Sequence, residues 1–204
     1  MAEDPARLMR FILELRQEGV THARVLAAME RTPRSHYAPA HMEGLVFDDI
    51  ALPLPHGQSM TKPATVARML AALDPQPDDA VLEIGTGSGY QAAVLSLLAR
   101  KVVTLDRWSD LVADARQKFG TARLMNVFAH VADGAKGWAD DAPYHRIVVA
   151  GEVDEAPQAL FEQLTPDGVL VAATAHRLVR WRNGTREDLG PAELPAFQEG
   201  LGEG

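Results

Sequence analysis

The sequence predicts one α/β domain with a doubly wound, mostly parallel, Rossmann-like sheet behind a helical preamble. Two observations lead to this fold class. After Pro63, apolar runs of strand length alternate with helical segments, which implies right-handed βαβ crossovers. A glycine-rich turn at residues 85–89 follows the first of these runs directly and opens a helical segment. With 204 residues, 47% of them hydrophobic, the chain can bury one substantial core but is short for two.

The N-terminal segment is expected to be helical and then irregular. Apolar residues recur near helical spacing over residues 8–15, and a second helix is expected over residues 21–31. Thr21 is its expected cap, and Val25, Leu26 and Met29 form its expected buried face. The periodicity fails over residues 32–63, where five prolines remove backbone donors. We interpret this stretch as a substrate-side loop.

The regular part of the chain follows. The expected strands are residues 80–84, 102–105, 127–131, 147–150 and 169–173, and the expected helices are residues 64–73, 89–99, 109–119 and 157–164. Residues 177–182 and those after Asn183-Gly184 are expected to form a hairpin, because Asn-Gly supplies the positive backbone angles of a tight turn. We therefore divide a single domain, residues 1–204, into a preamble with the loop (1–63), a cofactor-binding core (64–175) and a C-terminal extension (176–204).

Composition excludes several classes of function. The formal net charge of -8 and the scattered basic residues predict no nucleic-acid partner, since phosphate binding needs clustered Lys and Arg. No run approaches the ~20 apolar residues of a bilayer helix, and the first ten residues lack the layout of a signal peptide. Cysteine is absent, and the seven histidines lack metal-ligand spacing. We expect a cytoplasmic protein without a metal site.

The glycine-rich turn separates two classes of ligand. A dinucleotide fingerprint needs glycine at positions 85, 87 and 90, but residue 90 is Tyr90 and the third glycine is Gly89. Glu83 stands just before Gly85 and Gly87, so the pattern is E-x-G-x-G-x-G. An acid there would repel a pyrophosphate but suits a ligand with an amino group and a sulfonium.

Two further acids end the next strands of the expected sheet. Asp106 lies at the distance from the first glycine where an acid accepts hydrogen bonds from a ribose diol. Asp133, followed by Gly134, ends the third strand, where a carboxylate can accept from an adenine amino group. Each acid alone is best interpreted as a turn residue or helix cap. Together with the glycine turn, they favour a nucleoside-binding site.

Four stretches closely resemble protein-L-isoaspartate O-methyltransferases. They are DDIALP at 48–53, GQSMTKP at 57–63, VARM at 66–69 and VLEIGTGSGY at 81–90. The resemblance implies that the chain uses S-adenosylmethionine, with S-adenosylhomocysteine as product, to esterify the α-carboxylate of isoaspartyl residues in damaged proteins or peptides and so start their repair. The family's loop motif is G-Q-T-I-S-x-P, and its final serine carries the active-site hydroxyl. The resemblance implies that Thr61 takes the place of this serine as the catalytic hydroxyl, and that Ser59 takes the place of the motif's threonine.

The resemblance and the turn together define the expected cofactor-binding set. It comprises Glu83, Gly85, Thr86, Gly87, Gly89, Asp106, Arg107, Asp133 and Gly134. The chain is expected to act as a monomer on isoaspartyl-containing proteins.

Three departures from the family's pattern leave two alternatives open. Residues 64–65 are Ala-Thr where the family has a bulky pair, residues 151–154 add two acids, and residues 193–197 replace R-F-V-P-L with an acid at the aligned arginine. The first alternative is a methyltransferase that acts on a different acceptor. The second is an adaptor that keeps the cofactor pocket but has lost catalysis.

Overall fold

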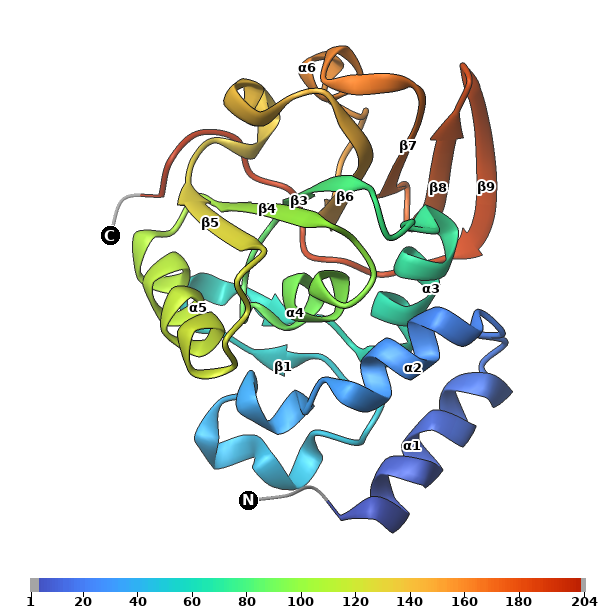
Figure 1. The fold of residues 1–204 in the computed structure, drawn as a ribbon, viewed down its shortest axis with the longest axis vertical. Helices are drawn as coiled ribbons and strands as arrows, with labels where there is room; N and C mark the ends of the chain where they lie inside the picture. The colour runs from blue at the N-terminus through green and yellow to red at the C-terminus, as the bar shows by residue number, and fades with distance from the viewer. Residues whose placement is uncertain (1–3, 203–204) are drawn as a thin grey trace.

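The computed structural model describes residues 4–202, so the outer ends of the predicted segments 1–63 and 176–204 lie outside it (Figure 1). The helices are α1 (Pro5–Gln17), α2 (Ala23–Arg31), α3 (Pro63–Leu73), α4 (Tyr90–Ser96), α5 (Ser109–Thr121) and α6 (Gln158–Glu162). The strands are β1 (Leu52–Pro53), β2 (Ser59–Met60), β3 (Ala80–Ile84), β4 (Lys101–Asp106), β5 (Val127–Val131), β6 (Tyr144–Glu152), β7 (Leu164–Thr174), β8 (Arg177–Arg182) and β9 (Thr185–Pro191). Within residues 4–202, no helix is long and apolar enough to cross a bilayer.

The central sheet confirms the predicted fold class. Across the described residues it has seven strands in the order β5-β4-β3-β6-β7-β8-β9. Strands β3 to β7 pair in parallel, and β8 and β9 add an antiparallel hairpin. The chain leaves β3 toward β4 on one side and returns through β6 on the other, so the sheet has a topological switch point beside β3.

Alternating side chains of the buried strands build one core on each face of the sheet. Val81, Val102 and Val148 pack in the larger cluster with α1 to α5. Leu82 and Ile147 pack in the smaller cluster on the other face, which is covered by α6 and short 3₁₀ turns. The strands therefore read as continuous apolar runs because both of their faces are covered.

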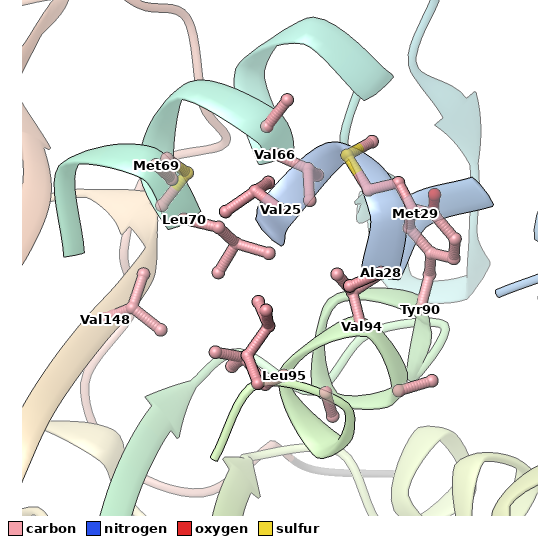
Figure 2. Packing of buried hydrophobic residues seen from close by; sticks show 14 of the residues in the cluster. Val25, Ala28, Met29, Val66, Met69, Leu70, Tyr90, Val94, Leu95 and Val148 are labelled. Carbon is pink, nitrogen blue, oxygen red and sulfur yellow. The ribbon is translucent and has the colours of Figure 1, made fainter. Parts of the chain in front are cut away.

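The larger core joins the N-terminal helices to the α/β unit. Figure 2 shows Val25 and Met29 of α2, Leu70 of α3 and Val94 of α4 in one cluster with Val148 of β6. The expected buried face of α2 is confirmed, but the expected cap is wrong. The helix begins at Ala23, and its N-cap is His22 instead of Thr21. The Nδ1 atom of His22 accepts a hydrogen bond from the amide of Val25 at 3.3 Å.

Residues 32–63 contain short elements that their sequence does not reveal. Two 3₁₀ turns, η1 (Arg34–His36) and η2 (Ala40–Leu45), come before the two-residue strand β1, and a third, η3 (Pro55–Gly57), lies between β1 and the two-residue strand β2. These strands pair Leu52 with Met60 and Pro53 with Ser59. The pairing places Ser59 and Thr61 directly before α3.

The C-terminal segment forms the predicted hairpin and then returns to the sheet. Asn183 and Gly184 have φ of 50° and 70°, the positive angles that the tight turn requires. Beyond β9 the chain runs back to the end of β6, where the amide of Glu152 donates to the carbonyl of Pro195 and the amide of Phe197 donates to the carbonyl of Glu152, each at 2.7 Å. This C-terminal segment, residues 195–202, therefore lies at the carboxyl edge of the sheet.

Candidate active site

The glycine turn is held against β4 by its own backbone. The amides of Gly85 and Thr86 both donate to the carbonyl of Leu105, at 2.7 and 3.0 Å. Gly85 has φ +94°, and Gly89 has φ +85° and lies so close to Phe119 that an added Cβ would come within 2.9 Å of its ring. Glycine is required at both positions because the backbone angle is left-handed, and at Gly89 the space for a side chain is also occupied.

Asp106 closes the turn from the end of β4. Its Oδ2 accepts from the amide of Gly87 at 2.8 Å, and its Oδ1 accepts from the amide of Trp108 at 3.1 Å. The side chain is buried, and burial raises the pKa of its carboxyl although these backbone hydrogen bonds oppose the shift. Each oxygen retains acceptor capacity, which matches a carboxylate that receives hydroxyl groups.

Glu83 lies beneath the turn rather than on a cavity wall. The residue is 0% exposed, and its Oε2 accepts from the hydroxyl of Thr104 at 2.5 Å. The hydroxyl of Thr104 is in turn 2.7 Å from that of Thr86. Burial raises the pKa of Glu83 to about 8, against the opposing effect of the Thr104 hydrogen bond. Glu83 therefore acts on the site from beneath, through Thr104, which contacts Thr86.

Two adjoining cavities open at the carboxyl edge of the sheet. The strand-end cavity is bounded by the ends of β3 to β6, by Trp108 and by the C-terminal segment. The loop cavity is bounded by residues 58–61, by the glycine turn and by the start of α4. Gly85 and Asp106 line both cavities, so the two spaces meet at the turn.

The two predicted hydroxyl residues face this junction. Ser59 and Thr61 both line the loop cavity, together with Gly85, Thr86 and Gly87 of the turn. Both are half-buried, and they come from a part of the chain far from the turn in sequence. The structure thus brings together the predicted catalytic residues and most of the predicted cofactor-binding residues.

The remaining predicted residues occupy less direct positions. Arg107 lines the strand-end cavity, but its guanidinium donates to Gln198 Oε1 at 2.9 Å and to the carbonyl of Leu201 at 3.0 Å, so it anchors the C-terminal segment. Gly134 lines the same cavity. Asp133 caps the 3₁₀ turn η4 (Gly134–Lys136) by accepting from the amide of Ala135, and its neighbours rather than its carboxylate line the cavity.

Sequence reasoning missed three residues that line both cavities, namely Gln58, Ala150 and Pro195. Ala150 lies near the end of β6 and could have been found, because the switch point of an open α/β sheet binds ligands. Gln58 lies inside the recognised loop motif but was given no role. Pro195 lies in residues 193–197, whose departure from the family's R-F-V-P-L segment pointed to the acid at Glu193 rather than to the proline.

Trp108 and His56 link the loop to the strand-end cavity. Their rings are parallel, with centroids 3.8 Å apart, and His56 Nε2 lies 2.8 Å from Asp110 Oδ2. Trp108 lines the strand-end cavity, whereas Tyr90 is buried against Tyr37 and lines the loop cavity. Both aromatic residues therefore border the site.

Two of the three departures from the family's pattern, residues 151–154 and 193–197, contribute residues to the strand-end cavity, but none of their acids lines it. Ala64 and Thr65 are buried in the first turn of α3. Glu152 is held by His176, whose amide and Nδ1 each lie 2.9 Å from a carboxylate oxygen. Glu193 is exposed, while Pro195 and Phe197 line the strand-end cavity. The added acids therefore do not line either space.

Comparison with known sequences gives consistent matches over nearly the whole chain. The family model described as protein-L-isoaspartate(D-aspartate) O-methyltransferase matches residues 6–180. A protein-L-isoaspartate O-methyltransferase of Paracoccus denitrificans is 43% identical over 215 residues, covering 100% of both chains. One from Roseobacter denitrificans is 46% identical, covering 97% of both chains.

Solved structures share the fold at lower sequence identity. A protein-L-isoaspartate O-methyltransferase structure superposes with a TM-score of 0.84 at 22% identity, covering 96% of this chain and 67% of that chain. One described as such an enzyme from Plasmodium falciparum, in complex with S-adenosyl-L-homocysteine, gives a TM-score of 0.80 at 17% identity, covering 97% of this chain and all of that chain. The family match and the full-length relatives decide the assignment: the chain belongs to the protein-L-isoaspartate(D-aspartate) O-methyltransferase family.

Proposed function

We propose that this protein transfers the methyl group of S-adenosylmethionine to the α-carboxylate of L-isoaspartyl residues in damaged proteins or peptides, which initiates their repair. One observation carries the proposal. The loop cavity is lined at once by the hydroxyl residues Ser59 and Thr61 and by the glycine turn with Asp106. An acceptor group and a nucleoside-bound methyl group can therefore meet in one space.

The described residues fit a cationic nucleoside. Glu83 and Asp106 are buried acids with raised pKa values, and no cation is among the causes of either shift. A sulfonium and an ammonium group would relieve the electrostatic cost of ionising these acids. The Gly85–Gly89 backbone allows close approach, and Asp106 has acceptor capacity for ribose hydroxyls.

The residues around the acceptor carboxylate need only to align it and to donate a hydrogen bond. Bound S-adenosylmethionine supplies a methyl group on a positively charged sulfur; its C–S bond breaks as a C–O bond to the carboxylate forms, and the two charges cancel without any proton transfer. A carboxylate with a reference pKa of about 4 is ionised at neutral pH, so no general base is required. Thr61 aligns the carboxylate and donates a hydrogen bond to its non-attacking oxygen, and Ser59 borders the same space. Exclusion of water favours the neutral products over the charged reactants.

Methyl transfer to a matched pair of peptides tests the function. The protein is incubated with radiolabelled S-adenosylmethionine and either an isoaspartyl peptide or its aspartyl twin. Label on the isoaspartyl peptide alone supports the proposal. Label on neither peptide, with cofactor binding retained, contradicts it and favours a different acceptor or an adaptor role.

Replacing Thr61 with valine tests the role of the hydroxyl. The change keeps the shape of the side chain, so methyl transfer should fall about 10-fold or more while S-adenosylhomocysteine binds as before. Thr185→Val on the exposed face of β9 is the matched control and should leave both quantities unchanged. Equal loss of transfer and of cofactor binding would reject the assignment.

The same proposal makes the protein a cytoplasmic monomer that acts on isoaspartyl-containing proteins. The lack of cysteine means that the fold depends on no disulfide and so requires no oxidising compartment. The charged edge strand β9 supports a monomer, because charge on an edge opposes pairing with a second sheet. Light scattering of the purified protein and fractionation of cells test the two statements separately.

A further inference from the structure

A buried guanidinium lies behind the hydroxyl side of the site. Arg34, in the 3₁₀ turn η1, is only 2% exposed. Its Nη1 donates to the carbonyl of Val46 at 2.9 Å, and its Nη2 donates to the carbonyls of Ile50 at 3.2 Å and Thr61 at 3.4 Å. Burial lowers the pKa of this group, yet an arginine stays charged at neutral pH. The chain thus keeps a cation in its interior for hydrogen bonds to backbone.

The three acceptors come from separate parts of the substrate-side loop. Val46 is the C-cap of the 3₁₀ turn η2, Ile50 precedes β1, and Thr61 follows β2. Regular structure contributes little here, because β1 and β2 have two residues each. A planar guanidinium holds several carbonyls in a fixed arrangement from separate nitrogen atoms, whereas the three donors of a lysine ammonium rotate about a single atom.

A second bond fixes the chain on the other side of Thr61. Asp49 Oδ1 accepts from the amide of Ala64 in the first turn of α3, at 2.7 Å. Thr61 is therefore held at its own carbonyl by Arg34, and the chain is held again three residues later by Asp49. Both anchors lie outside the two cavities, whose described linings include neither Arg34 nor Asp49.

We infer that Arg34 is a positioning residue for the methyl-transfer reaction: by binding the carbonyls of Val46, Ile50 and Thr61, it sets the backbone from which the Thr61 hydroxyl meets the acceptor carboxylate. The inference rests on the proposed function and extends it to a group that touches neither substrate nor cofactor. Because a shift of about 1 Å at a reacting group can cost about 100-fold in rate, loss of this anchor should act on kcat.

The test compares Arg34→Lys and Arg34→Ala with the wild-type chain. We expect kcat for the isoaspartyl peptide to fall about 10- to 100-fold in both variants. The dissociation constant of S-adenosylhomocysteine, measured by calorimetry, should change less than about 3-fold, because Arg34 does not line the strand-end cavity. Arg24→Ala is the matched control, since Arg24 also donates to a backbone carbonyl, that of Leu98, at 3.2 Å but remote from the site. Its kcat should stay at the wild-type value.

Chemical rescue separates positioning from general support of the fold. Guanidinium ion at tens of millimolar, added to Arg34→Ala, should restore part of kcat, while equal urea, a neutral molecule of similar shape, and equal sodium chloride should not. Unchanged kcat in folded Arg34→Lys and Arg34→Ala overturns the inference. So does a loss of cofactor binding that parallels the loss of kcat, or a failure of guanidinium to restore any activity.

Hydrogen exchange distinguishes failure of this inference from failure of the proposed function. Amides of residues 46–61 should exchange faster in Arg34→Ala than in the wild-type chain, while those of β3 and β4 should not change. If the wild-type protein labels no isoaspartyl peptide, the proposed function is wrong, and the exchange result still decides whether Arg34 holds the loop. Unchanged exchange over residues 46–61 overturns the inference whatever the acceptor is.

Discussion

Replacing Glu83 with glutamine is expected to stabilise the folded protein at alkaline pH. The carboxyl is fully buried, and its pKa is raised from 4.5 to about 8. Well below pH 4.5 the group is protonated in the folded and unfolded chains alike, so it contributes no difference. As the pH rises toward 8, the unfolded chain releases the proton and the folded chain keeps it, so the free energy of unfolding falls. The full cost is present above pH 8.

The size of the effect follows from the two pKa values. The interval between 4.5 and about 8, at ~1.4 kcal/mol per pKa unit, sets an upper bound on the order of 5 kcal/mol. Relaxation and water penetration reduce such costs, so we expect a gain of about 2 kcal/mol or more at pH 9. For a chain of this length, that gain corresponds to ~4 °C or more in Tm. Glutamine retains an oxygen that can accept from Thr104, so that contact is kept.

Thermal unfolding followed by circular dichroism between pH 5 and pH 9 measures the effect. The difference in Tm between Glu83→Gln and the wild-type chain should grow with pH. Glu30→Gln, on the exposed face of α2, is the control and should follow the wild-type curve. Parallel curves for Glu83→Gln and wild type, or a less stable variant at pH 9, would refute the reasoning and show that Glu83 is ionised in the fold.

Three further predictions concern the cavities. Asp106→Asn should weaken S-adenosylhomocysteine binding about 10-fold or more in calorimetry, because an amide accepts fewer hydrogen bonds than a carboxylate. The control Asp114→Asn, at an exposed residue, should leave the affinity unchanged, and equal affinity of Asp106→Asn and the wild-type chain would contradict the ribose-binding role of Asp106. Gly89→Ala should lower the free energy of unfolding by ~1–3 kcal/mol in urea titrations, because the φ of Gly89 is +85° and Phe119 occupies the space that the added methyl group needs. An unchanged urea midpoint of unfolding would count against a rigid turn. An isoaspartyl peptide should bind about 5-fold more tightly to the complex with sinefungin, a positively charged amine analogue of the methyl donor, than to the complex with S-adenosylhomocysteine, whose sulfur is neutral. No Lys, Arg or His of residues 4–202 lines the loop cavity, so the bound ligand itself must supply the positive charge that attracts the peptide carboxylate, and equal peptide affinity in the two complexes would contradict this charge effect.

Much of the α/β core could be predicted because its signals are local. Strands β3 and β5 begin and end at the predicted residues, since they are short apolar runs between turn residues. The turn at Asn183 and Gly184 was predictable from two residues. Helix starts were less so, because the cap of α2 depends on the ring of His22, which sequence propensity ranks below the hydroxyl of Thr21.

The site was predictable in its motifs but not in its geometry. Glu83 and Ile84 are consecutive strand residues, so they face opposite sides of the sheet, and only Ile84 lines the strand-end cavity. Nothing in the sequence shows which of these two side chains lies on the side of the sheet that borders the cavity. The role of Arg34 depends on carbonyl groups, which every residue possesses and which leave no pattern in the sequence.

The route of the last residues has a practical consequence for anyone who handles this enzyme. The amide of Gly202 donates to the carbonyl of Arg107 at 3.0 Å, so the C-terminal segment is tied to a residue that lines the strand-end cavity. A bulky label attached at Gln198 would start in the lining of this cavity, whereas one attached at Arg10 would start on α1, a helix that lines neither cavity. Labels for binding assays therefore belong on α1, and loss of residues 195–202 should alter cofactor affinity before it alters folding.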